Sequence, residues 1–204
     1  MPPKPKFTKE EIVNTALNIV SEKGTEALTA RELGKALGSS ARPIFTVFKN
    51  MEELQTEVRN AAMRRFESYA ERKLPDMPPF KQIGMQMVLF GAGEPRLYRL
   101  LFMSENPNAG EFDDIYGVLG KVAERCIETI RRDYELSAEK AKELFENMWI
   151  YTFGIGALCA TGVCRFSNER LSEMLSAEFR AMTLMIKNDE KNYSRACAKD
   201  RPNH

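Results

Sequence analysis

The segment TARELGKALGSSARPIFTVFKNMEEL, residues 29–54, decides the fold of the first part of the chain. It predicts two short helices around a tight turn, followed by the start of a longer third helix. Thr29 and Glu32 match a capping box, in which the threonine oxygen and the glutamate carboxylate each accept a backbone N–H of the first turn. Apolar residues follow at helical spacing, and Gly38 can adopt the left-handed conformation that ends a helix.

The second helix of the pair is expected at about residues 40–48. Ser39 and Ser40 are suited to cap it, and Pro43 is tolerated in a first turn because the N–H groups there lack helical partners. Ile44 and Phe48 lie one turn apart and are expected to face inward. Asn50, three residues before Glu53, marks the start of the third helix.

The charge pattern of this segment indicates its partner. Between Leu33 and Met51 the chain has three basic residues, Lys35, Arg42 and Lys49, and no acidic one. A helix pair with an exposed, acid-free second helix is typical of a helix-turn-helix that enters the DNA major groove. Residues 1–6, MPPKPK, add a basic arm that either reaches DNA or is a solvated terminus.

Residues 7–58 resemble the N-terminal DNA-binding domain of TetR/AcrR-type transcriptional regulators. The matching segments, in the family's order, are Ile12–Gly24, Leu28 and Thr29, Arg31–Gly38, and Ile44, Phe45, Phe48, Asn50 and Glu52–Leu54. Two positions depart from the family pattern. Phe45 stands where a tyrosine commonly contacts a phosphate through its hydroxyl, and Met51 stands where a lysine is common.

The resemblance implies an all-α protein with a three-helix helix-turn-helix DNA-binding domain and a larger helical ligand-binding and dimerisation domain. We expect the DNA-binding domain at residues 1–50, a connecting helix at 51–74, the second domain at 75–190 and a polar tail at 191–204. Prolines at positions 75, 78 and 79 end the connecting helix. Further helices are expected at about 80–91, 95–103, 112–134, 138–164 and 168–187.

The candidate DNA contacts combine hydroxyl, basic and aromatic side chains. Arg42 suits a guanine or a phosphate, and Lys49 suits a phosphate. The full set is Thr29, Ser40, Arg42, Phe45, Thr46 and Lys49. For Phe45 the alternative is a place in the core, and for Thr29 it is capping alone.

The candidate ligand contacts are methionine and aromatic residues, which form adaptable apolar pockets between helices. They are Met87, Phe90, Phe102, Met103, Met148, Trp149, Tyr151 and Phe153, and the alternative for each is ordinary core packing. If they line a pocket, the ligand is more apolar than charged.

Residues 147–164 carry no charge, which raises the question of a membrane span. The segment contains three glycines, Gly154, Gly156 and Gly162, which lower its hydrophobicity. A buried helix is therefore the better interpretation. By the resemblance, the helices at about 138–164 and 168–187 pack against their symmetry mates in a homodimer. Close packing within one subunit is the alternative.

Composition excludes several other classes of protein. The four cysteines lack paired ligand spacing and the only histidine is His204, so we expect no zinc site, and no cofactor is indicated. No apolar segment follows the first lysines, so we expect no signal peptide and a cytoplasmic location. No catalytic constellation or phosphate-cradling glycine loop is present, so we predict that the chain is not an enzyme.

The sequence therefore predicts a DNA-binding transcriptional regulator, a repressor, that acts as a homodimer on a double-stranded operator. A small, mostly apolar effector in the second domain is expected to modulate operator binding. The alternative is a helical ligand carrier or protein-interaction module with a vestigial helix-turn-helix. The departures at Phe45 and Met51 favour that alternative.

Overall fold

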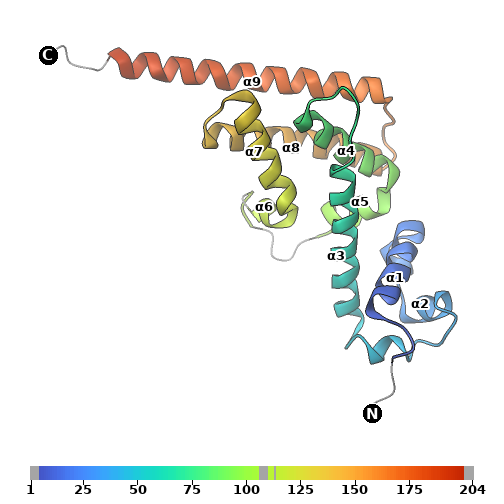
Figure 1. The fold of residues 1–204 in the computed structure, drawn as a ribbon. Helices are drawn as coiled ribbons and strands as arrows, with labels where there is room; N and C mark the ends of the chain where they lie inside the picture. Colours follow the sequence, from blue (N-terminus) through green and yellow to red (C-terminus); the bar gives the residue numbers. More distant parts are fainter. Residues whose placement is uncertain (1–4, 106–109, 113, 200–204) are drawn as a thin grey trace. The chain divides into compact units, whose positions relative to one another are not determined.

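A computed structural model describes residues 5–105, 110–112 and 114–199, and every regular element in these ranges is helical (Figure 1). This confirms the all-α fold. The α-helices are α1 (Lys9–Lys23), α2 (Ala30–Ala36), α3 (Met51–Ala70), α4 (Pro79–Gly93), α5 (Pro95–Phe102), α6 (Asp114–Leu119), α7 (Lys121–Tyr134), α8 (Ala138–Ala160) and α9 (Asn168–Lys199). Two 3₁₀ helices, η1 (Thr25–Ala27) and η2 (Ile44–Thr46), flank α2.

The chain forms two compact units. The N-terminal unit contains residues 1–71, 87–107 and 156–165, and the C-terminal unit contains residues 72–86, 108–155 and 166–204. Helices α4 and α8 therefore contribute residues to both units. The functional boundaries expected at 50, 74 and 190 stay predictions, and residues 200–204 of the expected tail lie outside the described residues.

Helix α1 supports the helix-turn-helix in the N-terminal unit, where it packs on α2, α3 and α5 (Figure 1). A capping box opens this helix: the Glu11 N–H donates to the Thr8 hydroxyl at 3.1 Å, and the Thr8 N–H donates to the Glu11 carboxylate at 2.7 Å. Its buried face consists of Ile12, Val13, Ala16, Leu17, Ile19 and Val20. Burial of these side chains fixes the platform on which α2 lies.

Helix α2 ends in a Schellman motif that turns the chain sharply. Gly38 is left-handed, with φ at +65°. The Gly38 N–H donates to the Lys35 carbonyl at 3.0 Å, and the Ser39 N–H donates to the Gly34 carbonyl at 2.8 Å. These two bonds satisfy carbonyls that a helix end would leave without partners.

After this turn, the backbone of Ser40 and Ala41 packs closely against Gly34 of α2. A Cβ built on Gly34 would lie 2.8 Å from the carbonyl carbon of Ser40 and 2.9 Å from the nitrogen of Ala41. Both neighbours are backbone atoms, so a side chain here requires the two segments to move apart. Only glycine fits this approach.

The predicted regular helix at 40–48 was wrong. The structure has turns and the single 3₁₀ turn η2, which starts after Pro43. Proline removes one N–H, and the β-branched residues Ile44, Thr46 and Val47 favour a helix only weakly. The Thr46 hydroxyl donates to the Pro43 carbonyl at 2.6 Å, and no side chain caps η2, so the expected Ser39 or Ser40 cap is not made among the described residues.

Other boundaries also differ from expectation. The connecting helix expected at 51–74 ends at Ala70. The helix expected at 112–134 is divided into α6 and α7 at Gly120, whose φ of +51° does not fit a helix. Helix α8 ends at Ala160, before the left-handed Gly162, rather than at 164. Helix α9 continues to Lys199, past the expected end at 187, because polarity alone does not stop a helix.

The C-terminal unit has its own apolar core, built around α8 and α9. Phe179 contacts Phe80 with ring centroids 5.6 Å apart and Tyr134 with centroids 4.8 Å apart. On α8, Leu144, Phe145 and Trp149 are buried, as are Leu171 and Leu175 on α9. Among the described residues, no helix is long and apolar enough to cross a membrane.

Gly34→Ala is predicted to lower the melting temperature. The added methyl meets backbone, and such overpacking costs about 1–3 kcal/mol, or several degrees for a chain of this size. The matched control is Gly117→Ala in α6, where a Cβ meets nothing within 4 Å, and no loss is expected there. Circular dichroism melting curves measure both. Equal stability of Gly34→Ala and the natural protein would contradict the close approach.

Candidate nucleic-acid interface

The predicted DNA contacts lie between buried anchors of the helix-turn-helix. Leu33, Ile44, Phe48 and Leu54 are all at most 1% exposed and belong to its core. The burial of these apolar side chains leaves polar and basic neighbours on the surface. The six candidates, Thr29, Ser40, Arg42, Phe45, Thr46 and Lys49, are all exposed.

Phe45 is the unusual member of this surface. It is 45% exposed, although it is a large apolar side chain, so it is not part of the core. It is the second residue of η2, directly after the fully buried Ile44. A solvent-facing aromatic ring beside polar and basic groups can contact a sugar or a thymine methyl.

Thr29 caps α2 as expected: its hydroxyl accepts the Glu32 N–H at 3.2 Å. The second half of the expected capping box is wrong. The Glu32 carboxylate accepts from the Lys23 ammonium at 2.6 Å, and the Thr29 N–H donates to the Ala27 carbonyl at 2.9 Å. This ion pair also holds the pKa of Glu32 below its usual value.

The start of α3 is closed by a related arrangement. The Asn50 side-chain oxygen accepts the Glu53 N–H at 2.9 Å, and the Glu53 carboxylate accepts the Lys49 N–H at 2.7 Å. Both ends of the exposed segment are therefore held by hydrogen bonds. The Lys49 backbone is fixed while its side chain remains exposed.

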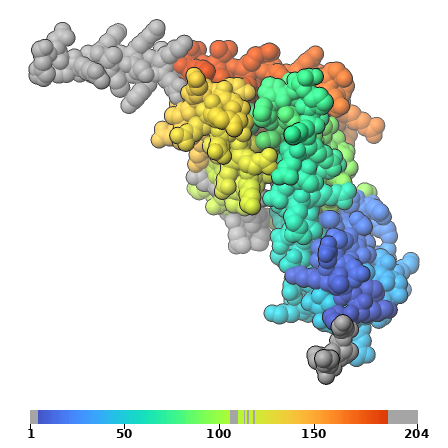
Figure 2. Space-filling view, in the orientation of Figure 1, coloured from blue at the N-terminus to red at the C-terminus, as the bar shows by residue number. Residues whose placement is uncertain are grey.

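Not all basic residues of the N-terminal unit are equally available to DNA. Lys9 pairs with Glu57 at 2.9 Å, and Lys23 pairs with Glu32. Lys6 contacts an uncharged group instead: its ammonium donates to the Ser39 hydroxyl at 3.1 Å. Figure 2 shows the start of the described chain, in blue, beside the lighter blue surface of the helix-turn-helix. The sequence pattern missed this contact, because no periodicity links residues 33 positions apart.

Comparison with known protein families identifies this domain. Residues 12–58 match the model of the bacterial regulatory proteins of the TetR family. The N-terminal domain of this chain is a TetR-family domain. No curated protein sequence matches the chain.

Solved structures of TetR-family regulators share the fold over nearly the whole chain. A transcriptional regulator from Aquifex aeolicus is 19% identical, with a TM-score of 0.59, over 86% of this chain and 99% of its own. The Streptomyces coelicolor TetR family protein ActR, in complex with (S)-DNPA, is 17% identical, with a TM-score of 0.54, over 88% and 98%. A TetR variant from Acinetobacter baumannii, in complex with minocycline, is 14% identical, with a TM-score of 0.55, over 91% and 98%.

These identities establish the fold of the chain, and the family match covers residues 12–58. The chain carries a helix-turn-helix domain of the TetR type and shares its fold with TetR-family transcriptional regulators. TetR-family regulators are DNA-binding proteins rather than enzymes, which agrees with the prediction made from the residues.

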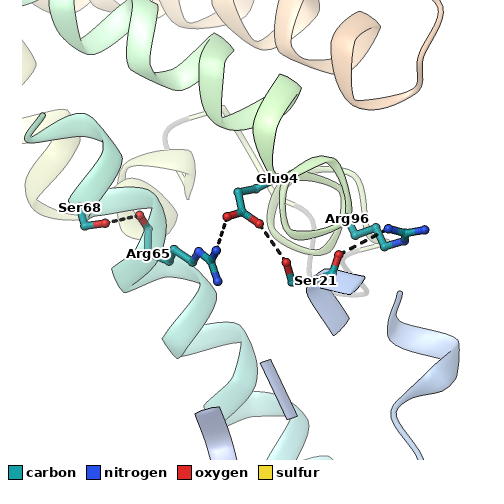
Figure 3. Close-up of polar contacts among 5 residues, drawn as sticks. All are labelled: Ser21, Arg65, Ser68, Glu94 and Arg96. Carbon is teal, nitrogen blue, oxygen red and sulfur yellow. Dashed lines mark hydrogen bonds and ion pairs between the residues drawn. The ribbon is translucent and has the colours of Figure 1, made fainter. Parts of the chain in front are cut away.

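The TetR-family domain is tied to α5 by a buried carboxylate. Glu94 is 8% exposed and precedes the first residue of α5. Its two oxygens accept from the Arg65 guanidinium of α3 and from the Ser21 hydroxyl of α1, the latter at 3.0 Å (Figure 3). One side chain therefore joins the first and third helices of the domain to the start of α5.

Arginines hold the other end of α5. The Arg59 guanidinium of α3 donates to the carbonyls of Leu100 and Leu101, the latter at 2.7 Å. Arg99 of α5 donates twice to the Ala160 carbonyl at the end of α8, at 3.1 and 2.6 Å. These bonds satisfy carbonyls of two helix ends with positive charge, the sign that a helix C-terminus favours. Sequence spacing gave no signal for them.

The candidate ligand contacts fall into both units. Met87 and Phe90 are buried in the N-terminal unit, while Phe102 is partly exposed and Met103 is 41% exposed. In the C-terminal unit Met148 and Trp149 are buried, and Tyr151 and Phe153 are partly exposed. Phe90 and Phe102 both pack on Phe66, with ring centroids 5.4 and 5.1 Å away. Their role in ligand binding stays a prediction.

A groove of about 580 Å³ lies on the C-terminal unit, between α8 and α9. It is lined by Tyr151, Arg170, Ser172, Glu173, Met174, Ser176, Ala177 and Arg180. Tyr151 is thus the one candidate ligand residue among its lining residues. Partial burial, then the nearby Glu178 carboxylate, raises the pKa of Tyr151, so its hydroxyl stays neutral at physiological pH.

The described residues contain no group of three or more histidine, cysteine or acidic side chains placed to hold a metal ion. Cys126 is buried, and burial raises the pKa of its thiol to about 12. A buried thiol that stays protonated is a poor nucleophile at neutral pH.

The Arg65–Glu94 pair is predicted to couple α3 to α5 by about 1–2 kcal/mol in a double-mutant cycle. Arg65→Ala, Glu94→Ala and the double variant are compared by urea unfolding, because removal of either partner leaves a partly buried charge. The Lys9–Glu57 pair, 52% and 29% exposed, is the control and should couple by about 0.2–1 kcal/mol. A coupling no larger than that of the control would show that Glu94 does not link these helices.

Proposed function

We propose that the protein is a sequence-specific repressor that binds a double-stranded operator as a homodimer. The observation that carries this proposal is the segment at residues 40–49, which contains no acidic residue and exposes the side chains of Arg42, Phe45 and Lys49. Two such segments in successive major grooves, roughly 34–36 Å apart, would read a site with two-fold symmetry. Bound there, the protein would block transcription of the adjacent gene.

Exposed apolar residues on α8 and α9 support dimerisation. Ile150 is 55% exposed, Leu184 is 64% exposed and Met185 is 44% exposed, all in the C-terminal unit. Together with Tyr151, Met174 and Ala177 in the groove they offer a face that a second copy would cover. We infer that the groove is closed by the partner's equivalent helices, because a two-fold operator requires two linked copies of the reading segment.

We also propose that a small, mostly apolar effector controls operator binding. The aromatic and methionine residues of α4, α5 and α8 are the candidate contacts, and the relatives solved with minocycline and with (S)-DNPA bind small molecules in the same fold. An effector that binds one conformer better than another would shift the population and so change operator affinity. The protein would act in the cytoplasm, where its operator lies.

The exposed surface of the helix-turn-helix argues against the alternative of a ligand carrier. In a carrier, the exposed ring of Phe45 beside Arg42 and Lys49 would have no binding role and would only leave apolar surface in contact with water.

Arg42→Ala and Lys49→Ala are predicted to weaken binding to DNA fragments selected by the natural protein. Loss of a base contact costs about 1–3 kcal/mol, or roughly 5- to 150-fold in affinity, and loss of a phosphate contact makes the dependence on salt shallower. Arg132→Ala is the control, since Arg132 lies in the C-terminal unit and pairs with Asp133. Gel-shift titrations measure all three. Full affinity in both test variants would refute this DNA-binding surface.

Ile150→Glu combined with Leu184→Glu is predicted to convert the dimer into monomers. In a dimer, both introduced carboxylates of each copy would be buried in an apolar contact, which costs several kcal/mol. Phe112→Glu is the control, because Phe112 is also exposed, at 38%, but lies on neither α8 nor α9. Sedimentation equilibrium reports the mass. A dimer that survives the double substitution would place the interface elsewhere.

A further inference from the structure

Lys6 lies against the turn of the helix-turn-helix, although it precedes α1 in the sequence. Its ammonium donates to the Ser39 hydroxyl at 3.1 Å and lies 5.3 Å from the centre of the Phe7 ring. Ser39 is itself fixed, because its N–H is bonded to the Gly34 carbonyl in the Schellman motif. The contact therefore holds Lys6 beside a rigid part of the domain.

The neighbouring Lys9 shows what a structural lysine in this domain looks like. Its ammonium pairs with the Glu57 carboxylate at 2.9 Å and lies 5.7 Å from the centre of the Phe48 ring. The carboxylate neutralises its charge, and Phe48 belongs to the core. The Ser39 hydroxyl, in contrast, positions Lys6 without neutralising it, so the field of this ammonium extends into solvent.

We propose that Lys6 contacts a backbone phosphate of the bound DNA and that Ser39 positions it. Ser39 directly precedes the segment at 40–49, which contains Arg42 and Lys49 and no acidic residue, so the Lys6 ammonium adds a positive charge at the start of this segment. A lysine held by a single hydroxyl carries no base-reading geometry, which makes a phosphate its natural ligand. This inference rests on the proposed function as a DNA-binding dimer.

The test compares Lys6→Ala with Lys9→Ala on one selected DNA fragment and on unrelated DNA, across a range of salt concentrations. A phosphate contact contributes about 0.9 to the slope of log affinity against log salt, so a dimer that loses both copies of Lys6 should lose about 1.8. Affinity at low salt should fall severalfold, by a similar factor on both DNAs. Lys9→Ala should keep the natural slope, and Lys6→Arg should restore it because the charge returns.

The outcomes separate this inference from the function on which it rests. If the natural protein binds DNA with a steep salt dependence and Lys6→Ala shows the same slope, Lys6 is not a phosphate contact. If Lys6→Ala lowers affinity only for the selected fragment, the lysine reads sequence and the proposal is wrong. Flat salt dependence of the natural protein would overturn the DNA-binding function itself. Melting curves confirm that each variant is folded.

Discussion

The approach of the Ser40–Ala41 backbone to Gly34 is the constraint on which the DNA-binding surface depends. A Cβ at residue 34 would come within 2.8 Å of the returning chain, so the turn can close only around a glycine. Closure brings Ile44 and Phe48 into the core beside Leu33. Once those anchors are buried, geometry leaves Arg42, Phe45 and Lys49 no direction except outward.

A second set of contacts connects this surface to the rest of its unit. At the start of α5, Glu94 accepts a hydrogen bond from Arg65 of α3. At the end of α5, Arg59 of α3 donates to the Leu100 carbonyl. Through Arg99, α5 also binds the last carbonyl of α8. Helix α3 begins directly after residues 40–49, so these polar contacts connect α5 and the end of α8 to the helix that follows the candidate DNA contacts.

Much of the N-terminal fold could be predicted because its signals are local. Capping residues such as Thr8 and Asn50, the left-handed Gly38 and the prolines after α3 act within a few positions of themselves. The helix at 40–48 was predicted wrongly, because Ile44 and Phe48 both face inward and lie one helical turn apart. In the structure only a single 3₁₀ turn forms after Pro43, where the β-branched residues favour a helix weakly. At Glu32, a capping signal was overridden by a nearby lysine.

The contacts that join distant segments could not be predicted from the sequence. Nothing in the spacing pairs Lys6 with Ser39 or Arg65 with Glu94, because such pairs are set by how helices pack. The exposure of the candidate DNA contacts was easier to predict than the surroundings of the candidate ligand contacts. Charged side chains such as Arg42 and Lys49 are rarely buried, whereas a methionine or phenylalanine such as Phe90 serves equally well in a core or in a pocket.

Selection of bound fragments from the organism's own sheared DNA, at moderate salt, is the decisive experiment for DNA binding by this protein. A dimer with two linked helix-turn-helix domains should enrich one short site with two-fold symmetry and half-sites roughly 10 base pairs apart. No enrichment, from protein shown to be folded and dimeric, would contradict this expectation and favour a helical carrier whose helix-turn-helix no longer binds DNA.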